Sequence, residues 1–198
     1  MEKISFAEYL REKIEIDELL IKKFYKKLTS EKLHKGEILL KPGQVCNHAF
    51  FVEKGLLRLY SIDKKGKEHL LQFAPEGWFI VDRGSMYFKE VSQYYIDAIE
   101  ATSIVYITDE FLDFASRESE KFRKYNEHLL HNHIRHLQNR INNLIAHSAE
   151  EKYQDFIKLY PDLTLRVPQW MMASFLGITP ESLSRVRRNL AKENYKPE

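Results

Sequence analysis

Cysteine is almost absent from this sequence. Cys46 stands alone among 198 residues, so a disulfide within the chain and a cysteine-ligated metal cluster are both excluded. We expect Cys46 to be a small apolar filler of the core, with a redox-sensitive thiol as the alternative. A chain without a disulfide framework suits a reducing compartment, so we expect a cytoplasmic protein.

Long apolar runs are also missing. No stretch approaches the roughly 18 apolar residues of a membrane-spanning helix. The first residues, MEKISFAEYLREKI, are charged and amphipathic and do not form a signal-peptide core. We therefore expect no membrane segment. Hydrophobic residues make up 43% of the chain, which is enough for one large domain or two small ones.

A large net charge is lacking, but the charges are unevenly spread. The net charge is only +2, yet residues 1–67 carry 15 basic and 10 acidic side chains, whereas residues 68–118 carry 3 and 10. Residues 164–198 carry six Lys or Arg against three acidic side chains. This distribution indicates separate tasks for separate regions.

The middle of the chain has the pattern of short β-strands. Between residues 32 and 108, runs rich in Val, Ile, Leu, Phe and Tyr alternate with turns such as Pro42-Gly43 and Pro75-Glu76-Gly77. Several short strands at this spacing predict a sandwich or a small barrel. The predicted strands cover residues 35–40, 47–54, 56–62, 68–73, 93–99 and 103–108.

Helical periodicity predicts helices on both sides of the strands. Two helices lie within residues 4–30, a short one covers 109–116, and a long one without Gly or Pro covers 118–147. Apolar residues recur along the long helix at the spacing of a helix that packs on its own copy, with packing on the strands of the same chain as the alternative. The predicted dimer interface comprises Leu130, Ile134, Leu137, Ile141 and Leu144.

Histidines gather in or at the end of the same long helix. We interpret them as polar flanking positions of a coiled coil, with a pH-sensitive dimer as the alternative. No carboxylate is placed to complete a ligand set, so we expect no metal and no cofactor. The five histidines are His128, His131, His133, His136 and His147.

The stretch from Leu165 to Leu190 has the pattern of two short helices joined by a tight turn. The first helix is predicted to begin near Pro168 and to end at Gly177, where a left-handed residue is favoured. Thr179 then offers an N-cap oxygen, and Pro180 suits the first position of the second helix. Together these signals predict a helix-turn-helix.

The second helix of this pair has two different faces. Leu183, Val186 and Leu190 form an apolar face. Polar Glu181, Arg185 and Arg188 share the opposite face, from which they could contact a groove of DNA. The basic surplus after residue 164 is what an element facing phosphates needs. The alternative is an ordinary surface pair of helices.

These parts, in this order, resemble the Crp/Fnr family of bacterial transcription regulators. The resemblance covers nearly the whole chain. It is clearest in two segments, HAFFVEKGLLRLYSIDKKGKEH (48–69) and LGITPESLSRVRRNL (176–190). It implies an α+β fold with an N-terminal β-roll (double-stranded jelly roll) sensor like the cyclic-nucleotide-binding fold, a long dimerisation helix and a C-terminal helix-turn-helix. The match places Glu181, Ser182 and Arg185 where family members touch bases, and Arg188 near the phosphates. The expected DNA-binding residues are Thr179, Glu181, Ser182, Ser184, Arg185 and Arg188.

The sequence departs from the family's cyclic-AMP-binding pattern. In cyclic-AMP-binding members a Gly-Glu pair is followed by Arg-Ser or Arg-Thr. An ungapped alignment puts Val81-Asp82 and Ser92-Gln93 at these positions, so the arginine is absent. We expect no response to cyclic AMP, and either an apolar or aromatic effector or aromatic rings that simply fill the core. The candidate effector pocket comprises Trp78, Phe79, Asp82, Arg83, Ser92 and Gln93.

A second departure concerns the wing that usually accompanies the helix-turn-helix. The chain ends soon after Leu190, so the strands that follow in the family are expected to be missing and the wing to be reduced. A hairpin before the motif, near residues 160–167, remains an open alternative.

We therefore expect a non-enzymatic DNA-binding transcription regulator that reads a palindromic operator as a homodimer. RNA polymerase and an unknown small-molecule effector are further candidate partners. The expected divisions are 1–117 for the sensor, 118–147 for the dimerisation helix and 148–198 for the DNA-binding domain. One alternative is a cupin-type metal enzyme, although Phe50 stands where the second histidine of that motif would follow His48. The other is a ligand-binding or scaffolding module whose helix pair is only structural.

Overall fold

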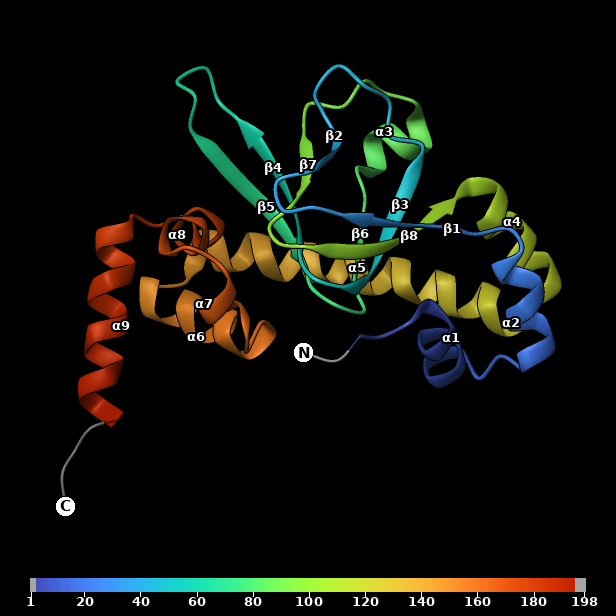
Figure 1. Ribbon diagram of the computed structural model, residues 1–198. Helices are drawn as coiled ribbons and strands as arrows, with labels where there is room; N and C mark the ends of the chain where they lie inside the picture. Colours follow the sequence, from blue (N-terminus) through green and yellow to red (C-terminus); the bar gives the residue numbers. More distant parts are fainter. Residues whose placement is uncertain (1–2, 195–198) are drawn as a thin grey trace. The chain divides into compact units, whose positions relative to one another are not determined.

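The computed structural model describes residues 3–194, and Figure 1 traces its elements along the chain. Two compact units are present, residues 1–130 and residues 131–198. The boundary falls inside one long helix, α5 (Glu120–Ala146). The division into 1–117, 118–147 and 148–198 stays a prediction.

The first unit begins with two helices whose starts are fixed by side-chain caps. At α1 (Phe6–Ile14), Ser5 and Glu8 form a reciprocal capping box. At α2 (Glu18–Tyr25), the Asp17 carboxylate accepts a hydrogen bond from the Leu20 backbone N–H at 2.9 Å. These caps confirm the two helices predicted within residues 4–30.

Eight strands and two further helices follow in this unit. The strands form two four-stranded antiparallel sheets, here called sheet A (order β1-β8-β3-β6) and sheet B (order β2-β7-β4-β5). The bounds are β1 (Thr29–Leu33), β2 (Ile38–Leu40), β3 (His48–Lys54), β4 (Leu57–Ile62), β5 (Glu68–Ala74), β6 (Phe79–Ile80), α3 (Arg83–Phe88), β7 (Tyr95–Ala98), β8 (Thr102–Thr108) and α4 (Asp109–Glu118).

Strand β3 shows how sheet A is buried on both faces. Phe50 and Val52 point into a cluster that also takes Leu57 and Ile96 from sheet B. Ala49 and Phe51 point the other way, into a second cluster built with α1, α2, α4 and the start of α5. Because side chains alternate across a strand, one strand serves two cores. The α+β β-roll predicted from the resemblance is confirmed.

Three short elements of this unit were not predicted. The sequence of β1, TSEKL, is mostly polar, and only Leu33 in it is buried. Strand β6 has two residues, and α3 has six. The predicted strand 35–40 is too long at its start, because residues 34–37 form a turn in which the Glu37 N–H donates to the His34 carbonyl at 3.1 Å.

The second unit is helical. After the end of α5, it contains α6 (Ala149–Leu159), α7 (Leu163–Arg166), α8 (Gln169–Leu176) and α9 (Pro180–Asn194). The hairpin left open at 160–167 is wrong, because α7 occupies this segment and the Val167 N–H donates to the Leu163 carbonyl at 3.0 Å. Tyr160 and Leu163 are both buried, so this segment contributes to the core of the unit. The expected reduction of the wing concerns residues 195–198, which lie outside the described residues.

We predict that Gly55→Ala lowers stability more than the matched control Gly43→Ala. Both glycines have a similar positive φ, +95° and +91°, so alanine meets similar backbone strain. A Cβ at Gly55 would also lie 2.5 Å from Thr102 Oγ1 and 2.6 Å from the Ala101 carbonyl oxygen, whereas nothing lies within 4 Å at Gly43. We expect an extra loss of roughly 1–3 kcal/mol in the free energy of unfolding. Urea denaturation followed by circular dichroism measures it, and equal midpoints for the two variants would contradict the prediction.

Candidate nucleic-acid interface

The turn between α8 and α9 is fixed by backbone geometry. Gly177 has a left-handed φ of +65°, and its N–H reaches the Ala173 and Ser174 carbonyls at the end of α8. Thr179 Oγ1 then accepts a hydrogen bond from the Ser182 N–H at 3.2 Å, which caps the start of α9. The predicted glycine stop and threonine cap are both present. Pro168 is the N-cap of α8, one position before the helix.

Helix α9 is oriented by the burial of its apolar face. Leu183 is 0% exposed and Val186 is 9% exposed, and α9 packs on both α6 and α8. Small Ala173 of α8 is also buried, which lets two helices approach closely. Since one face of α9 is held inside the unit, its opposite face must be presented to solvent.

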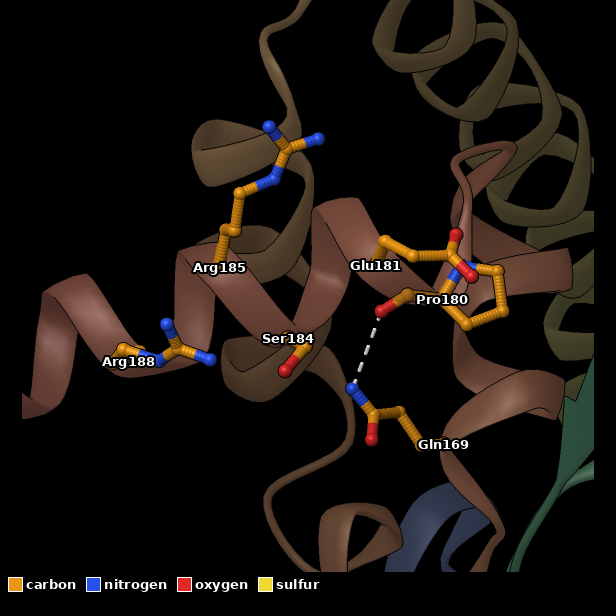
Figure 2. Close-up of a pocket in the computed structure, with 6 residues that line it drawn as sticks. All are labelled: Gln169, Pro180, Glu181, Ser184, Arg185 and Arg188. Carbon is orange, nitrogen blue, oxygen red and sulfur yellow. Dashed lines mark hydrogen bonds between the residues drawn. The ribbon is translucent and has the colours of Figure 1, made fainter.

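The exposed face of α9 borders an open depression of about 480 Å³ (Figure 2). Glu181, Arg185 and Arg188 are exposed, and Ser184 is half-buried beside them. Gln169 reaches from the start of α8 and donates through Nε2 to the Pro180 carbonyl at 3.4 Å. The lining residues are Gln169, Pro180, Glu181, Ser184, Arg185 and Arg188.

Two polar side chains at the start of α9 are engaged with their neighbours. The half-buried Ser182 hydroxyl lies 3.2 Å from the Thr179 hydroxyl and accepts from Arg185 Nη2 at 3.5 Å, the outer limit of a hydrogen bond. Hydrogen bonds from its own backbone N–H and then from the Thr179 hydroxyl lower the pKa of Glu181, so this carboxylate stays charged. The face therefore combines hydrogen-bond acceptors and guanidinium donors.

Gln169 and Pro180 were not among the predicted DNA-binding residues. In the sequence, Gln169 only continues the first helix, and Pro180 only starts the second. The available signal was a polar residue at the head of QWMMASFL, a helix whose only other polar residue is Ser174. Its place beside the exposed face of α9 depends on how two helices cross, which periodicity alone does not give.

Comparisons with known proteins agree with this architecture. The cyclic nucleotide-binding domain family matches residues 30–118. The anaerobic regulatory protein of Pasteurella multocida is 25% identical over 171 residues, covering 81% of this chain and 62% of the relative. Among solved structures, FixK2 from Bradyrhizobium japonicum superposes with a TM-score of 0.71 at 19% identity, covering 84% of this chain and 86% of that chain. A Crp/Fnr-family transcriptional regulator from Thermus thermophilus superposes with a TM-score of 0.64 at 18% identity, covering 86% and 89%.

In sequence, this chain is similar to four bacterial regulatory proteins at 24–26% identity. It spans less than two thirds of the length of the Pasteurella relative. The relatives it matches bear the names of regulators, such as the electron transport regulator A of Shewanella oneidensis, and none of those four is named as an enzyme. No helix within residues 3–194 is both long and apolar enough to cross a membrane.

The residues of the candidate effector pocket do not all lie on one surface of the first unit. Trp78 packs on the cluster between the two sheets, whereas Phe79 packs on the cluster with α1. Asp82 is buried and caps α3 by accepting from the Ser85 N–H at 3.2 Å. Ser92 is buried and accepts from the Tyr94 N–H at 3.0 Å, and Gln93 is exposed.

Arg83 is the basic residue of this group, and its guanidinium is partly buried beside an aromatic ring. Its Nε atom is buried without a hydrogen-bond partner among the described residues, and its guanidinium lies 5.8 Å from the centre of the Tyr87 ring. The aromatic residues nearby do not all fill the core, because Tyr87 and Phe88 are 46% and 77% exposed.

The structure also shows the surroundings of Cys46 and of two histidines. Cys46 is buried, and burial raises the pKa of its thiol. His48 packs edge-on against Tyr106, with 5.1 Å between the ring centres. His147 follows the last residue of α5. Among the side chains that the structure describes, no three from His, Cys, Asp or Glu gather closely enough to hold a metal ion.

The predicted dimer residues form an apolar stripe on α5. They are 40–57% exposed within one chain, a large fraction for Leu and Ile on a well-formed helix. Exposed apolar side chains at this spacing favour packing on a second copy. The stripe comprises Leu130, Ile134, Leu137, Ile141 and Leu144.

We predict that Leu137→Asp converts a dimer into monomers. Burying such a side chain in an interface is worth about 1.5–3 kcal/mol, and an aspartate there would also need desolvation. Gln138→Asp is the matched control, because it adds the same charge at an exposed position one residue outside the stripe. Light scattering after size exclusion, at tens of micromolar protein, measures the mass. A monomeric wild-type protein under these conditions would show that the stripe is not a dimer interface.

Proposed function

We propose that this chain is a DNA-binding transcription regulator of the Crp/Fnr type, which reads a palindromic operator as a homodimer. The observation that carries the proposal is the exposed row of Glu181, Arg185 and Arg188 on a helix whose other face is buried in a helix-turn-helix. The names of its relatives, among them regulatory protein HlyX of Actinobacillus pleuropneumoniae, support the same class of function.

Direct reading of bases would depend on the first two turns of α9. The Arg185 guanidinium has the fork geometry that binds guanine O6 and N7, and the ionised Glu181 carboxylate can accept from cytosine N4. Thr179, Ser182 and Ser184 would supply hydroxyl contacts at the same end of the helix. The contacts that join Thr179, Ser182 and Arg185 support a common surface.

Phosphate contacts would flank this reading surface. Arg188 lies about one turn beyond Arg185 and is exposed, so it can neutralise a phosphate. Gln169, at the start of α8, also borders the depression and can donate to the DNA backbone. Such contacts fix the register of the protein on DNA but carry little sequence information.

A homodimer would give this surface its two-fold symmetry. If two copies packed through their α5 stripes, the dimer would carry two α9 helices related by a two-fold axis. Recognition helices of such dimers enter successive major grooves roughly 34 Å apart. The operator would then be an inverted repeat. The apolar character of the stripe supports this arrangement.

We further propose that cyclic AMP is not the effector. A bound cyclic nucleotide brings a phosphate charge that needs a positive partner, ideally a bidentate arginine. Ser92 and Gln93 are neutral, the Ser92 hydroxyl is engaged with Tyr94, and the Asp82 carboxylate is engaged with the α3 backbone. The surplus of acidic residues between 68 and 118 also disfavours an anion. An apolar or aromatic effector fits this region better.

We predict that Arg185→Ala weakens and broadens DNA recognition. Loss of a bidentate base contact should cost about 1–3 kcal/mol and relax one position in each half-site. Arg188→Ala is the matched comparison, because loss of a phosphate contact should weaken all sequences alike and flatten the salt dependence. Fluorescence anisotropy with the preferred duplex and its single-position variants measures both. Unchanged affinity and unchanged base preference in Arg185→Ala would show that α9 is not the reading helix.

We predict no saturable binding of cyclic AMP or cyclic GMP in isothermal titration calorimetry. The uncompensated phosphate charge should keep any affinity weaker than about 100 μM. Saturable binding tighter than about 100 μM would contradict the prediction, and its loss on changing Ser92 or Gln93 would show that these neutral residues help to hold the nucleotide.

A further inference from the structure

The end of α8 is held by an arginine from α5. Arg140 Nη2 donates to the Phe175 carbonyl oxygen at 2.9 Å, and the guanidinium carbon lies 3.8 Å from the centre of the Phe175 ring. This carbonyl belongs to the last turn of α8, where backbone oxygens lack partners within the helix and the helix dipole favours a positive charge. One side chain therefore satisfies the end of α8 and covers its last aromatic ring.

Phe175 itself is part of an aromatic cluster. Its ring lies 5.6 Å from Phe156 and 5.8 Å from Tyr160, and all three side chains are buried. Burial lowers the pKa of the Arg140 guanidinium, and the neighbouring Tyr160 partly opposes this effect. The half-buried guanidinium thus binds the Phe175 carbonyl oxygen and covers the Phe175 ring, and the charge-assisted hydrogen bond makes the contact directional.

A second contact from α5 reaches the turn that follows. A Cβ placed on Gly177 would lie 2.9 Å from Leu144 Cδ2, so the Leu144 side chain already touches the turn. Arg140 and Leu144 are four residues apart and therefore lie on the same side of α5. Together they hold α8 and the turn directly before Pro180, the first residue of α9.

The same segment of α5 is tied to α6. Asn143 Nδ2 donates to Asp155 at 3.0 Å, and Lys152 Nζ donates to the Leu144 carbonyl at 3.1 Å. Because α6 also packs on α9, the last turns of α5 are connected to the recognition helix from two sides. Leu144 also belongs to the apolar stripe, so the segment that would meet a second copy is the segment that holds the turn.

We propose that Arg140 is a positioning residue for DNA recognition: it sets the direction of α9 through the Phe175 carbonyl and ring, and sequence specificity depends on it although it lies outside the exposed face of α9. The inference rests on the proposed DNA-binding function. A misdirected α9 would still meet phosphates, since these tolerate small shifts, but Arg185 would lose its bidentate geometry on a base.

The test compares specific with non-specific affinity for the full chain. Arg140→Met keeps much of the apolar volume and removes the donor and the charge. Arg135→Met is the matched control, because it removes the same charge from an exposed position of α5. Each protein is titrated against the duplex that the wild type selects and against a scrambled duplex of the same length and composition, over a series of salt concentrations.

We expect Arg140→Met to bind the selected duplex about ten-fold more weakly, the effect of losing one charge-assisted hydrogen bond. Its affinity for the scrambled duplex and its salt dependence should match the wild type, because no phosphate contact is lost. Arg140→Lys keeps the charge but not the planar fork, so the ratio of the two affinities should fall only about three-fold. Arg135→Met should leave this ratio unchanged.

The outcomes separate the inference from the function on which it rests. The inference is overturned if Arg140→Met has the same ratio of selected-duplex to scrambled-duplex affinity as the wild type. This holds even if the melting temperature falls, because the arginine would then serve stability alone. If Arg140→Met does not fold, a wild-type ratio in Arg140→Lys overturns it in the same way. A parallel loss of affinity for both duplexes with a flatter salt dependence would mean that Arg140 contacts phosphate, which also overturns it. A wild-type protein that does not distinguish the two duplexes would instead refute the proposed function.

Discussion

The burial of one face of α9 is the constraint on which the proposed DNA-reading surface depends. Leu183 and Val186 are buried inside the second unit, so α9 cannot rotate freely about its own axis. Glu181, Arg185 and Arg188 are exposed as a consequence of that packing. A helix that carried the same charges without this buried face would present them in many directions, and a bidentate contact to one base would be lost.

The position of that helix in turn depends on residues outside it, some adjacent in the sequence and some far away. Gly177 permits the left-handed turn, Thr179 caps the helix, and Arg140 and Leu144 hold the preceding segment. These contacts connect the last turns of α5 with the helix-turn-helix inside one compact unit. Assembly on the stripe and recognition of DNA would therefore involve neighbouring side chains of the same helix.

Periodicity predicted the features that depend on local sequence. The apolar runs of β3 and β4, the two helices within residues 4–30 and the glycine stop of α8 can all be recognised from short stretches of sequence. Strand β1 was missed because TSEKL owes its conformation to pairing with β8 and not to its own composition.

The errors and omissions elsewhere have the same physical origin. Residues 160–167 contain a helix and not a hairpin because Tyr160 and Leu163 enter a core that the sequence does not reveal. Likewise, the contact between Arg140 and Phe175 joins residues 35 positions apart, and Gln169 borders α9 only because two helices cross.

The central claim is that two copies of this helix-turn-helix read DNA together. It is tested most directly by incubating the wild-type protein with a pool of random duplexes and sequencing the bound fraction over successive rounds. The account predicts an enriched inverted repeat whose half-site centres lie about 10 base pairs apart or a multiple of this spacing. Enrichment of no sequence, or of a single half-site without its inverted copy, would contradict the account.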